Sequence, residues 1–295
     1  MLSSKFSQNL SKIAKKTDDY LKKFFFKKNI SPLIKPMKYG LFSGGKRFRS
    51  AIVVSTGKIF KIDSKKLIVI GAAIECIHSY SLMHDDLPAM DNDSLRRGKL
   101  STHKKFNEFT AILAGNSLLT SAFEILSSRN LNLTSKTKNE LVESLSLCCG
   151  YEGLARGQYS DLTFEHKKIS VQKIINMQEN KTGKLFGFCC ESVGIIKNAS
   201  LKEKKFLKNL GIKIGLLFQI VDDLIDCYGD KKIVGKFTKK DAVKGKATLV
   251  NLWGRKKSLS FAKKLKKEIK SKILKYGYKS NDLLQCVDFI LKRKF

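Results

Sequence analysis

The segment His84-Asp85-Asp86-Leu87-Pro88-Ala89-Met90-Asp91 holds the last proline of the chain and the first of two aspartate clusters. Proline lacks the backbone N–H that a helix interior uses, and its ring clashes with the preceding turn, so a helix reaching Asp85 is expected to end or distort there. Asp91 follows Asp85 by six residues, about a third of a turn out of phase on a regular helix. We therefore predict a turn at Pro88 that brings Asp91 back beside Asp85.

The remainder of the chain has a helical pattern. The 207 residues after Pro88 contain no proline, and apolar residues recur three and four positions apart, as in Leu259, Ala262, Leu265, Ile269 and Ile273. This period is typical of amphipathic helices. There is no alternating strand pattern of any length, no internal repeat and no Gly/Ser-rich linker. We predict an all-α fold in which residues 1–295 form a single domain.

The second aspartate cluster, Asp222-Asp223-Leu224-Ile225-Asp226, lies about 130 residues after the first. On a helix, Asp222 and Asp226 share one face, while Leu224 and Ile225 can face the core. Such closely spaced like charges destabilise a fold unless a counter-charge is present. Carboxylates in two groups suit Mg²⁺ shared with a phosphate-bearing substrate. The alternative is that each cluster only caps a helix or lies at a solvated loop end.

Two basic motifs accompany the aspartates. One is Gly44-Gly45-Lys46-Arg47-Phe48-Arg49 and the other is Ser94-Leu95-Arg96-Arg97-Gly98. Arginine binds phosphate through two parallel hydrogen bonds, lysine supplies a point charge, and paired glycines allow close backbone approach. Both motifs are therefore interpreted as anion-binding segments, although a solvated basic surface is the alternative for each.

Composition restricts the location and the partners. The net charge is +32, but its excess is mostly lysine and is spread along the chain, so no nucleic-acid-binding stripe is predicted. Seven scattered cysteines without a Cys-x-x-Cys pair suggest reduced thiols in the cytoplasm. The most hydrophobic segment, 67–83, contains Glu75 and His78, which favours a buried helix over a membrane span. We expect a soluble, cytoplasmic protein without stable membrane insertion, since the first residues also lack the apolar stretch of a signal peptide.

Together these motifs resemble those of the polyprenyl synthetase family, the trans-isoprenyl diphosphate synthases, and especially its bacterial farnesyl diphosphate synthases. Further matching stretches are Thr110–Gly115, Lys181-Thr182-Gly183, Phe218-Gln219 before the second cluster, and Gly245-Lys246-Ala247-Thr248. The ordered motifs extend over about 200 of the 295 residues. The resemblance implies an isoprenoid-synthase helical bundle with the two aspartate clusters facing each other across a central cavity, usually as a homodimer.

The implied activity is prenyl transfer by ionisation, condensation and elimination. About three Mg²⁺ ions would bind the diphosphate of dimethylallyl or geranyl diphosphate and make it a good leaving group. The double bond of isopentenyl diphosphate would attack the resulting allylic cation, and the departing diphosphate would accept a proton. The implied product is (2E,6E)-farnesyl diphosphate.

The resemblance assigns roles by matched position. The metal ligands would come from Asp85, Asp86, Asp91, Asp222, Asp223 and Asp226, with Asp86, Asp223 and Asp226 in supporting roles. The allylic diphosphate would be bound by Arg96, Lys181 and Lys236, with Lys246 nearby. Isopentenyl diphosphate would be bound by Gly45, Lys46, Arg49, His78 and Arg97. Lys181, Thr182 and Gln219 would stabilise the cationic centre. For His78, a satisfied core histidine is the alternative.

Product length and alternative functions depend on fewer residues. Tyr80, with Ser81 beside it, lies five residues before Asp85 and would stop the growing chain at C15. A geranylgeranyl diphosphate synthase and a non-catalytic partner subunit of a prenyl synthase are the alternatives. A terpene cyclase normally carries Asn, Ser and Glu in its second metal motif, which the second cluster lacks. Residues 229–246, rich in lysine and glycine, are interpreted as a lid that closes on bound diphosphate, or else as a flexible loop.

Overall fold

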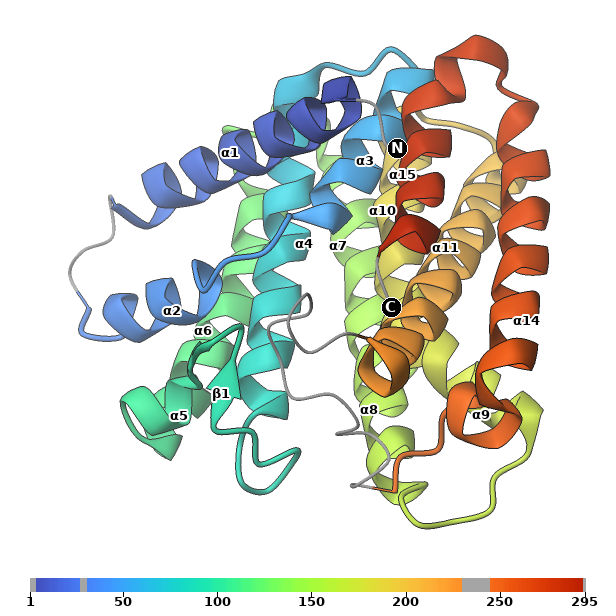
Figure 1. The fold of residues 1–295 in the computed structure, drawn as a ribbon. Helices are drawn as coiled ribbons and strands as arrows, with labels where there is room; N and C mark the ends of the chain where they lie inside the picture. The colour runs from blue at the N-terminus through green and yellow to red at the C-terminus, as the bar shows by residue number, and fades with distance from the viewer. Residues whose placement is uncertain (1–3, 27–30, 230–244, 294–295) are drawn as a thin grey trace. The chain divides into compact units, whose positions relative to one another are not determined.

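A computed structural model describes residues 4–26, 31–229 and 245–293 (Figure 1). Within these residues almost all regular structure is helical, which confirms the predicted all-α fold. A two-stranded antiparallel hairpin, β1 (Leu95–Arg96) and β2 (Lys99–Leu100), follows the first aspartate cluster. The helices are α1 (Ser4–Phe26), α2 (Ile34–Leu41), α3 (Phe48–Ile59), α4 (Ser64–Asp85), α5 (Thr102–Lys105), α6 (Glu108–Ser127), α7 (Ser135–Cys149), α8 (Leu154–Thr163), α9 (Val171–Gln178), η1 (Glu179–Gly183), α10 (Lys184–Ile196), α11 (Leu201–Tyr228), α14 (Leu249–Leu274), η2 (Gly277–Ser280) and α15 (Asn281–Lys292).

The chain divides into two compact units, each of which contains one aspartate cluster. The first-cluster unit comprises Ser3–Val54 and Ile62–Val142. The second-cluster unit comprises Ser55–Lys61 and the described residues between Glu143 and Arg293. The division falls inside α3 and α7.

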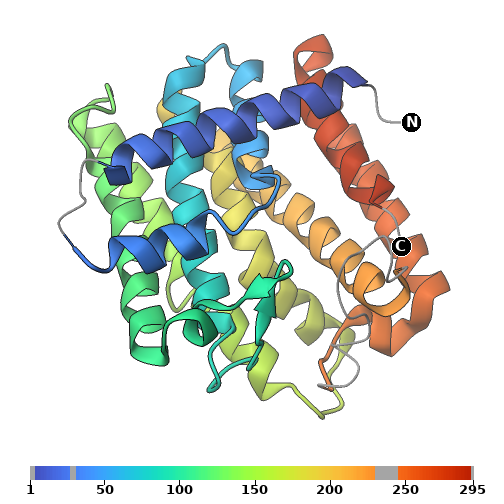
Figure 2. The ribbon, with the colours of Figure 1, turned by 60° about the vertical axis from the view of Figure 1, so that its left-hand side comes forward.

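The core of the first-cluster unit is built on α4. Asp63 caps its N-terminus by accepting a hydrogen bond from Lys65 N at 3.0 Å. The helix packs against α6, α2 and α1, which crosses it in dark blue in Figure 2. Its apolar side chains from Leu67 to Ile77 are buried on nearly every face, so the predicted buried helix over 67–83 is confirmed.

Two helices of the first-cluster unit, α4 and α6, are long and apolar enough to cross a membrane by length and composition alone. Most of the apolar window of α4 is buried inside the fold. The core helix of a globular protein meets the same criteria, so this observation is weak evidence for a membrane span.

The second-cluster unit is organised around α11, which packs against α10, α14 and η1. Gly211 of α11 allows α10 to approach closely, because a Cβ at this position would lie 2.2 Å from the Phe186 carbonyl oxygen. Thr248 caps α14 by accepting a hydrogen bond from Asn251 N at 3.0 Å. Ala262, Leu265, Ile269 and Ile273 are buried along α14, as their spacing predicts.

All seven thiols are free, and six of them are buried, Cys227 being the partly exposed one. Burial raises the pKa of Cys190 to about 12, so this thiol stays protonated at neutral pH. The six buried cysteines therefore act as small core residues, in keeping with the expectation from their spacing.

Candidate functional site

The first aspartate cluster is formed where α4 ends. The helix stops at Asp85, and the chain then turns so that Asp91 N donates a hydrogen bond to Asp85 O at 2.8 Å. Asp93 N likewise donates to Asp86 O at 3.1 Å. Both the helix end and the return of Asp91 to Asp85 are thus confirmed. Asp85 and Asp91 are half-buried side chains on the two arms of this turn.

Asp86 differs from its neighbours because it faces inward. Its buried carboxylate accepts a 2.9 Å hydrogen bond from Arg96 Nε and a second one from Arg96 Nη2. Burial raises the pKa of Asp86, and the Arg96 guanidinium offsets part of that increase. The pair joins the hairpin to the end of α4, so Asp86 supports the turn that carries Asp85 and Asp91.

The glycine-rich basic motif is a loop with left-handed backbone. Gly44 and Gly45 have φ values of 100° and 117°, a region that favours glycine. A Cβ on Gly45 would lie 2.6 Å from Arg97 Nη1, and the same nitrogen donates to Gly44 O. The two basic motifs, far apart in sequence, therefore meet within one unit.

Arg47 of this loop has a different role from its neighbours. Its buried guanidinium donates to Asp18 Oδ1 at 2.7 Å and to Leu41 O at 2.6 Å, and lies 3.7 Å from Glu75. With its donors directed to protein acceptors, Arg47 anchors the loop between α1 and α4. Lys46 is exposed and Arg49 is half-buried on either side of it.

His78, on α4, lies in the positive field of this loop. Burial and the charges of Arg49 and Arg97 hold the pKa of His78 well below its ordinary value. The imidazole is therefore neutral at physiological pH and can donate one hydrogen bond without adding charge. The predicted isopentenyl diphosphate residues Gly45, Arg49, His78 and Arg97 thus share one neighbourhood.

The second cluster lies on α11, as its spacing predicts, but its inward-facing member was not foreseen. Leu224 is buried and Ile225 is half-buried, close to the expectation. The acidic Asp223 is buried as well. Its carboxylate accepts hydrogen bonds from Gln178 Nε2 at 2.7 Å and from Gln219 Nε2 at 2.8 Å. Asp222 and Asp226 lie on the other, more accessible face of the helix.

A π-helical turn, η1, carries Lys181 and Thr182 next to this cluster. Such turns are rare and occur often at functional sites because they shift backbone groups out of the regular ladder. Thr182 Oγ1 donates to Gln219 Oε1 at 2.7 Å, which links the turn to Asp223 through Gln219. A Cβ on Gly157 would lie 2.1 Å from Lys181 N, so glycine is required where α8 passes the turn.

Asp161, on α8, was not among the site residues predicted from the sequence. Its buried carboxylate accepts a 2.7 Å hydrogen bond from Lys181 Nζ and another of 2.7 Å from Lys246 Nζ. Glu165 adds a 3.1 Å contact to Lys246. Burial raises the pKa of Asp161, but the two lysines outweigh that effect and hold it below its ordinary value. An isolated acid one helical turn after Gly157 was the signal available in the sequence.

Gln158, beside Gly157 on α8, is a second residue that sequence reasoning missed. It is buried, and neither of its amide atoms has a hydrogen-bond partner within the part of the chain that the structure describes. Buried amides are usually satisfied. A polar ligand or water is the expected partner of this side chain.

The residues expected to limit product length lie on α4. Tyr80 is half-buried and packs edge-on against His84, with ring centroids 5.4 Å apart and an interplanar angle of 89°. Ser81 is buried and donates to His78 O at 3.0 Å. Tyr80 therefore precedes the first cluster on the same rigid helix.

A family model described as polyprenyl synthetase matches residues 31–287. The chain belongs to the polyprenyl synthetase family. It is 36% identical over 294 residues to the farnesyl diphosphate synthase of Haemophilus influenzae, covering 98% of this chain and 99% of that protein. The apo crystal structure of an FPP/GFPP synthase from Zymomonas mobilis is 34% identical with a TM-score of 0.84, covering 97% of this chain and 99% of the other. A geranyltransferase from Helicobacter pylori, complexed with magnesium and isoprenyl diphosphate, is 31% identical with a TM-score of 0.83 and 99% coverage of both chains.

The carboxylates of this polyprenyl synthetase fit magnesium. In the described residues no three His, Cys, Asp or Glu side chains converge as a ready-made metal cage. Mg²⁺ does not require one, because it keeps several waters and is usually held by one or two carboxylates together with substrate phosphates. Asp85 and Asp91 in one cluster, and Asp222 and Asp226 in the other, offer such sparse oxygen donors. Asp86 and Asp223 are already held by protein donors.

One predicted site residue of this polyprenyl synthetase, Lys236, lies outside the described residues, as does most of the predicted lid over 229–246. Lys246, at the end of that segment, is described and is bound to Asp161. His166 N donates a hydrogen bond to the carbonyl oxygen of Gly245 at 2.9 Å, which ties the end of this segment to the turn after α8.

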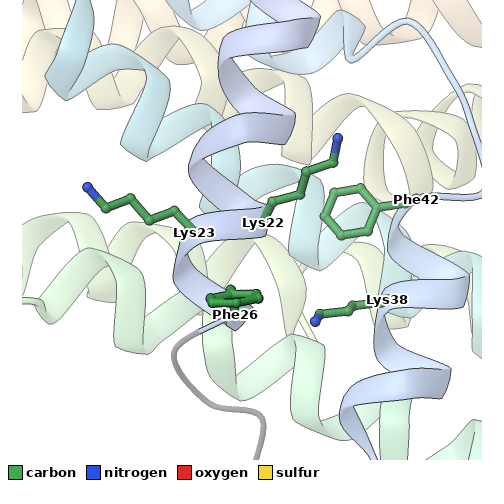
Figure 3. A pocket seen from close by; sticks show the side chains of 5 residues that line it. All are labelled: Lys22, Lys23, Phe26, Lys38 and Phe42. Carbon is green, nitrogen blue, oxygen red and sulfur yellow. The ribbon is translucent and has the colours of Figure 1, made fainter.

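A cavity of about 460 Å³ lies in the first-cluster unit between α1 and α2. Figure 3 shows its lining, with the Lys38 side chain extending toward Phe26. The other lining residues are Lys22, Lys23 and Phe42. None of the predicted substrate or metal residues contributes to it.

Proposed function

We propose that this polyprenyl synthetase is a short-chain prenyltransferase that condenses isopentenyl diphosphate with dimethylallyl and then geranyl diphosphate to give (2E,6E)-farnesyl diphosphate. The observation that carries the proposal is that each aspartate cluster is joined to a basic segment: Arg96 binds Asp86 of the first cluster, and the η1 turn with Lys181 is linked through Thr182 and Gln219 to Asp223 of the second. The similarity to proteins named farnesyl diphosphate synthase and geranyltransferase supports the substrate class.

The metal ligands in this proposal are Asp85 and Asp91 in one unit and Asp222 and Asp226 in the other. Mg²⁺, about three per site, would supply charge neutralisation of the allylic diphosphate, which makes it a good leaving group. The Asp86–Arg96 pair fixes the turn that presents Asp85 and Asp91. This division gives two carboxylates of each cluster to the metals and one to the protein.

Lys181 and Lys246 provide the ammonium groups for the allylic diphosphate. Asp161 already holds both of them, so their positions are set before substrate arrives. Preorganised charges avoid the reorganisation cost that free lysines would incur. Arg96 and Lys236 are proposed as further contacts to the same diphosphate.

The positive charge that develops on the allylic carbon is stabilised by oxygen atoms of η1 and α11. These are the Lys181 carbonyl, the Thr182 hydroxyl and the Gln219 amide oxygen. The Asp223 carboxylate accepts from the Gln219 nitrogen, which directs the amide oxygen toward Thr182. The orientation of this dipole is thereby fixed. The departing diphosphate accepts the proton in the final elimination, so no side-chain base is needed.

Isopentenyl diphosphate is bound by the loop 44–49 and Arg97. Lys46, Arg49 and Arg97 supply charge, Gly45 allows close backbone approach, and neutral His78 donates a hydrogen bond. The depressed pKa of His78 fits a crowded cationic pocket that awaits an anion. Tyr80 with Ser81 ends the space for the growing chain.

A cytoplasmic homodimer is part of the proposal. The seven free thiols support a reducing compartment. Phe109, Ile112 and Leu113 form an exposed apolar stripe at i, i+3 and i+4 on α6. Such a stripe supports pairing with a second copy. Neither nucleic acid nor stable membrane insertion is part of the proposed function.

The test is product analysis with purified protein, Mg²⁺, radiolabelled isopentenyl diphosphate and dimethylallyl diphosphate, followed by chain-length separation. A C15 product that disappears with EDTA, and in Asp85→Ala and Asp222→Ala, is the expected result. A C20 or longer product would keep the chemistry and remove the role given to Tyr80. Folded protein that forms no metal-dependent product would instead favour a non-catalytic partner subunit.

A further inference from the structure

Arg293, just beyond the end of α15, makes three contacts with the part of α11 that carries the second cluster. Its Nη1 donates to Asp222 Oδ1, and its Nη2 donates to the Phe218 carbonyl oxygen at 3.0 Å. The guanidinium also lies over the Phe218 ring, 4.0 Å from the ring centroid. Together these contacts bind the end of the last described helix to a predicted metal ligand.

Arg293 is placed as a counter-charge to Asp222 that a divalent cation can replace. Asp222 needs a positive partner, because Asp223 and Asp226 lie within one helical turn of it. The Asp222 side chain is nevertheless 43% exposed. Ion pairs open to solvent are weak, since water screens them and ordering two side chains costs entropy. A divalent cation with bound diphosphate would compete effectively for the same oxygen.

The contacts with Phe218 can hold the Arg293 side chain after a metal ion has replaced it at Asp222. A guanidinium over an aromatic face is held without a carboxylate, and the Phe218 carbonyl still accepts one N–H. The arginine can therefore leave Asp222 by a small side-chain rotation while α15 keeps its position against α11. Lysine lacks the planar fork and could not keep the carbonyl and carboxylate contacts together in this way.

We propose that Arg293 is the resident counter-ion of Asp222 in the metal-free protein and is displaced when a divalent cation binds. The inference rests on the proposed function, in which Asp222 is a metal ligand. Arg293 thus sets the apparent metal affinity of the second cluster and couples metal binding to release of the Arg293 side chain from Asp222. It is a positioning residue, because it acts through Asp222 and touches no substrate in this assignment.

The experiment is a Mn²⁺ titration of the full chain with saturating inorganic pyrophosphate, with free Mn²⁺ measured by electron paramagnetic resonance. The variants are Arg293→Ala, Arg293→Lys, Asp222→Asn and Lys292→Ala. Lys292 is the matched control, since it is the exposed neighbour and its loss removes the same charge. Circular dichroism verifies that each variant is folded.

Arg293→Ala is expected to lower the apparent Kd for Mn²⁺ by about two- to five-fold, the range equivalent to an exposed ion pair. Arg293→Lys should fall between this variant and wild type, and Lys292→Ala should match wild type. If Arg293→Ala binds Mn²⁺ no more tightly than Lys292→Ala, or more weakly than wild type, the counter-ion role is wrong. If Asp222→Asn binds Mn²⁺ as wild type does, Asp222 is not a ligand, and the proposed metal site fails together with this inference.

Discussion

Adjacent aspartates in each cluster have opposite surroundings, and this difference determines what each can do. Asp223 is buried and accepts from two amides, whereas Asp222, one residue earlier, is exposed enough to exchange its partner. Asp86 is likewise held by Arg96, while Asp85 lies at the helix end. A buried carboxylate without donors would cost several kcal/mol. The inward aspartates are therefore fixed by their donors, and the outer ones are the proposed metal ligands.

At the scale of single residues, His78 gives a pH prediction. Its pKa is depressed in the folded state by burial and by Arg49 and Arg97, so the unfolded chain takes up the proton first. Stability is unaffected above the unfolded pKa of about 6.5 and falls as the pH decreases below it. Between pH 7.5 and 5.5 this histidine should remove about 1.4 kcal/mol of unfolding free energy.

The measurement compares urea unfolding of wild type and His78→Gln at both pH values. The variant should lose less stability than wild type on acidification, by that amount. His166→Gln serves as the control, because His166 is exposed and on a loop. An identical pH dependence in wild type and His78→Gln would contradict the burial of a neutral imidazole.

At the scale of elements, one carboxylate joins three segments of the second-cluster unit. Asp161 on α8 binds Lys181 of η1 and Lys246, which precedes α14. Removing a buried partner leaves uncompensated charge, at a cost on the order of 3 kcal/mol. Asp161→Asn is therefore expected to lower the unfolding free energy by about that amount, and Glu165→Gln, at the edge of the cluster, by less than about 1 kcal/mol.

Binding of inorganic pyrophosphate with Mg²⁺ distinguishes a diphosphate-binding role of Lys181 and Lys246 from a purely structural one. Because diphosphate can replace the missing carboxylate between Lys181 and Lys246, it should raise the melting temperature of Asp161→Asn more than that of wild type. Equal ligand-induced shifts in both proteins would indicate that these lysines do not face the diphosphate. Thermal unfolding with and without ligand provides the comparison.

Helix positions followed from the sequence where a local cause was sufficient. Pro88 and the six-residue spacing predicted both the end of α4 and the return of Asp91, and apolar spacing predicted the buried face of α14. The π turn at Lys181 could not be predicted in this way, because it depends on how closely Gly157 of α8 approaches. The burial of Arg47 likewise depends on Asp18 and Glu75, which are distant in sequence.

At the scale of the whole molecule, charge and apolar surface have different consequences. The net charge of +32 comes from lysines along the entire chain, and most of the surface ion pairs, such as Lys58–Asp282, contribute little stability. The positive field would attract anionic substrates and keep copies of the chain apart. The proposed association between copies therefore requires apolar contact strong enough to overcome this repulsion.

The apolar stripe on α6 is the surface available for that contact. Phe109, Ile112 and Leu113 are 65%, 41% and 47% exposed. In a two-fold interface both copies use the same surface, so each of these positions contributes one buried side chain from each copy. Complete burial of a fully exposed apolar side chain contributes about 1.5–3 kcal/mol, and these partly exposed ones contribute correspondingly less. Leu113→Glu should therefore shift the protein from dimer to monomer, because each copy would bury a carboxylate in the apolar interface.

Size-exclusion chromatography with light scattering, over a range of protein concentrations and at low and high salt, measures the assembly. Wild type is expected at twice the chain mass, more firmly at high salt, where lysine repulsion is screened. Tyr278→Glu is the control, since Tyr278 is also highly exposed but lies on η2 of the second-cluster unit and is not part of the stripe. A wild-type monomer would refute the homodimer, and a Leu113→Glu dimer would place the interface on another surface. Because salt screens the charge repulsion and leaves the apolar contact in place, the increase in dimer between low and high salt reports the repulsion, and the Leu113→Glu variant reports the apolar contact.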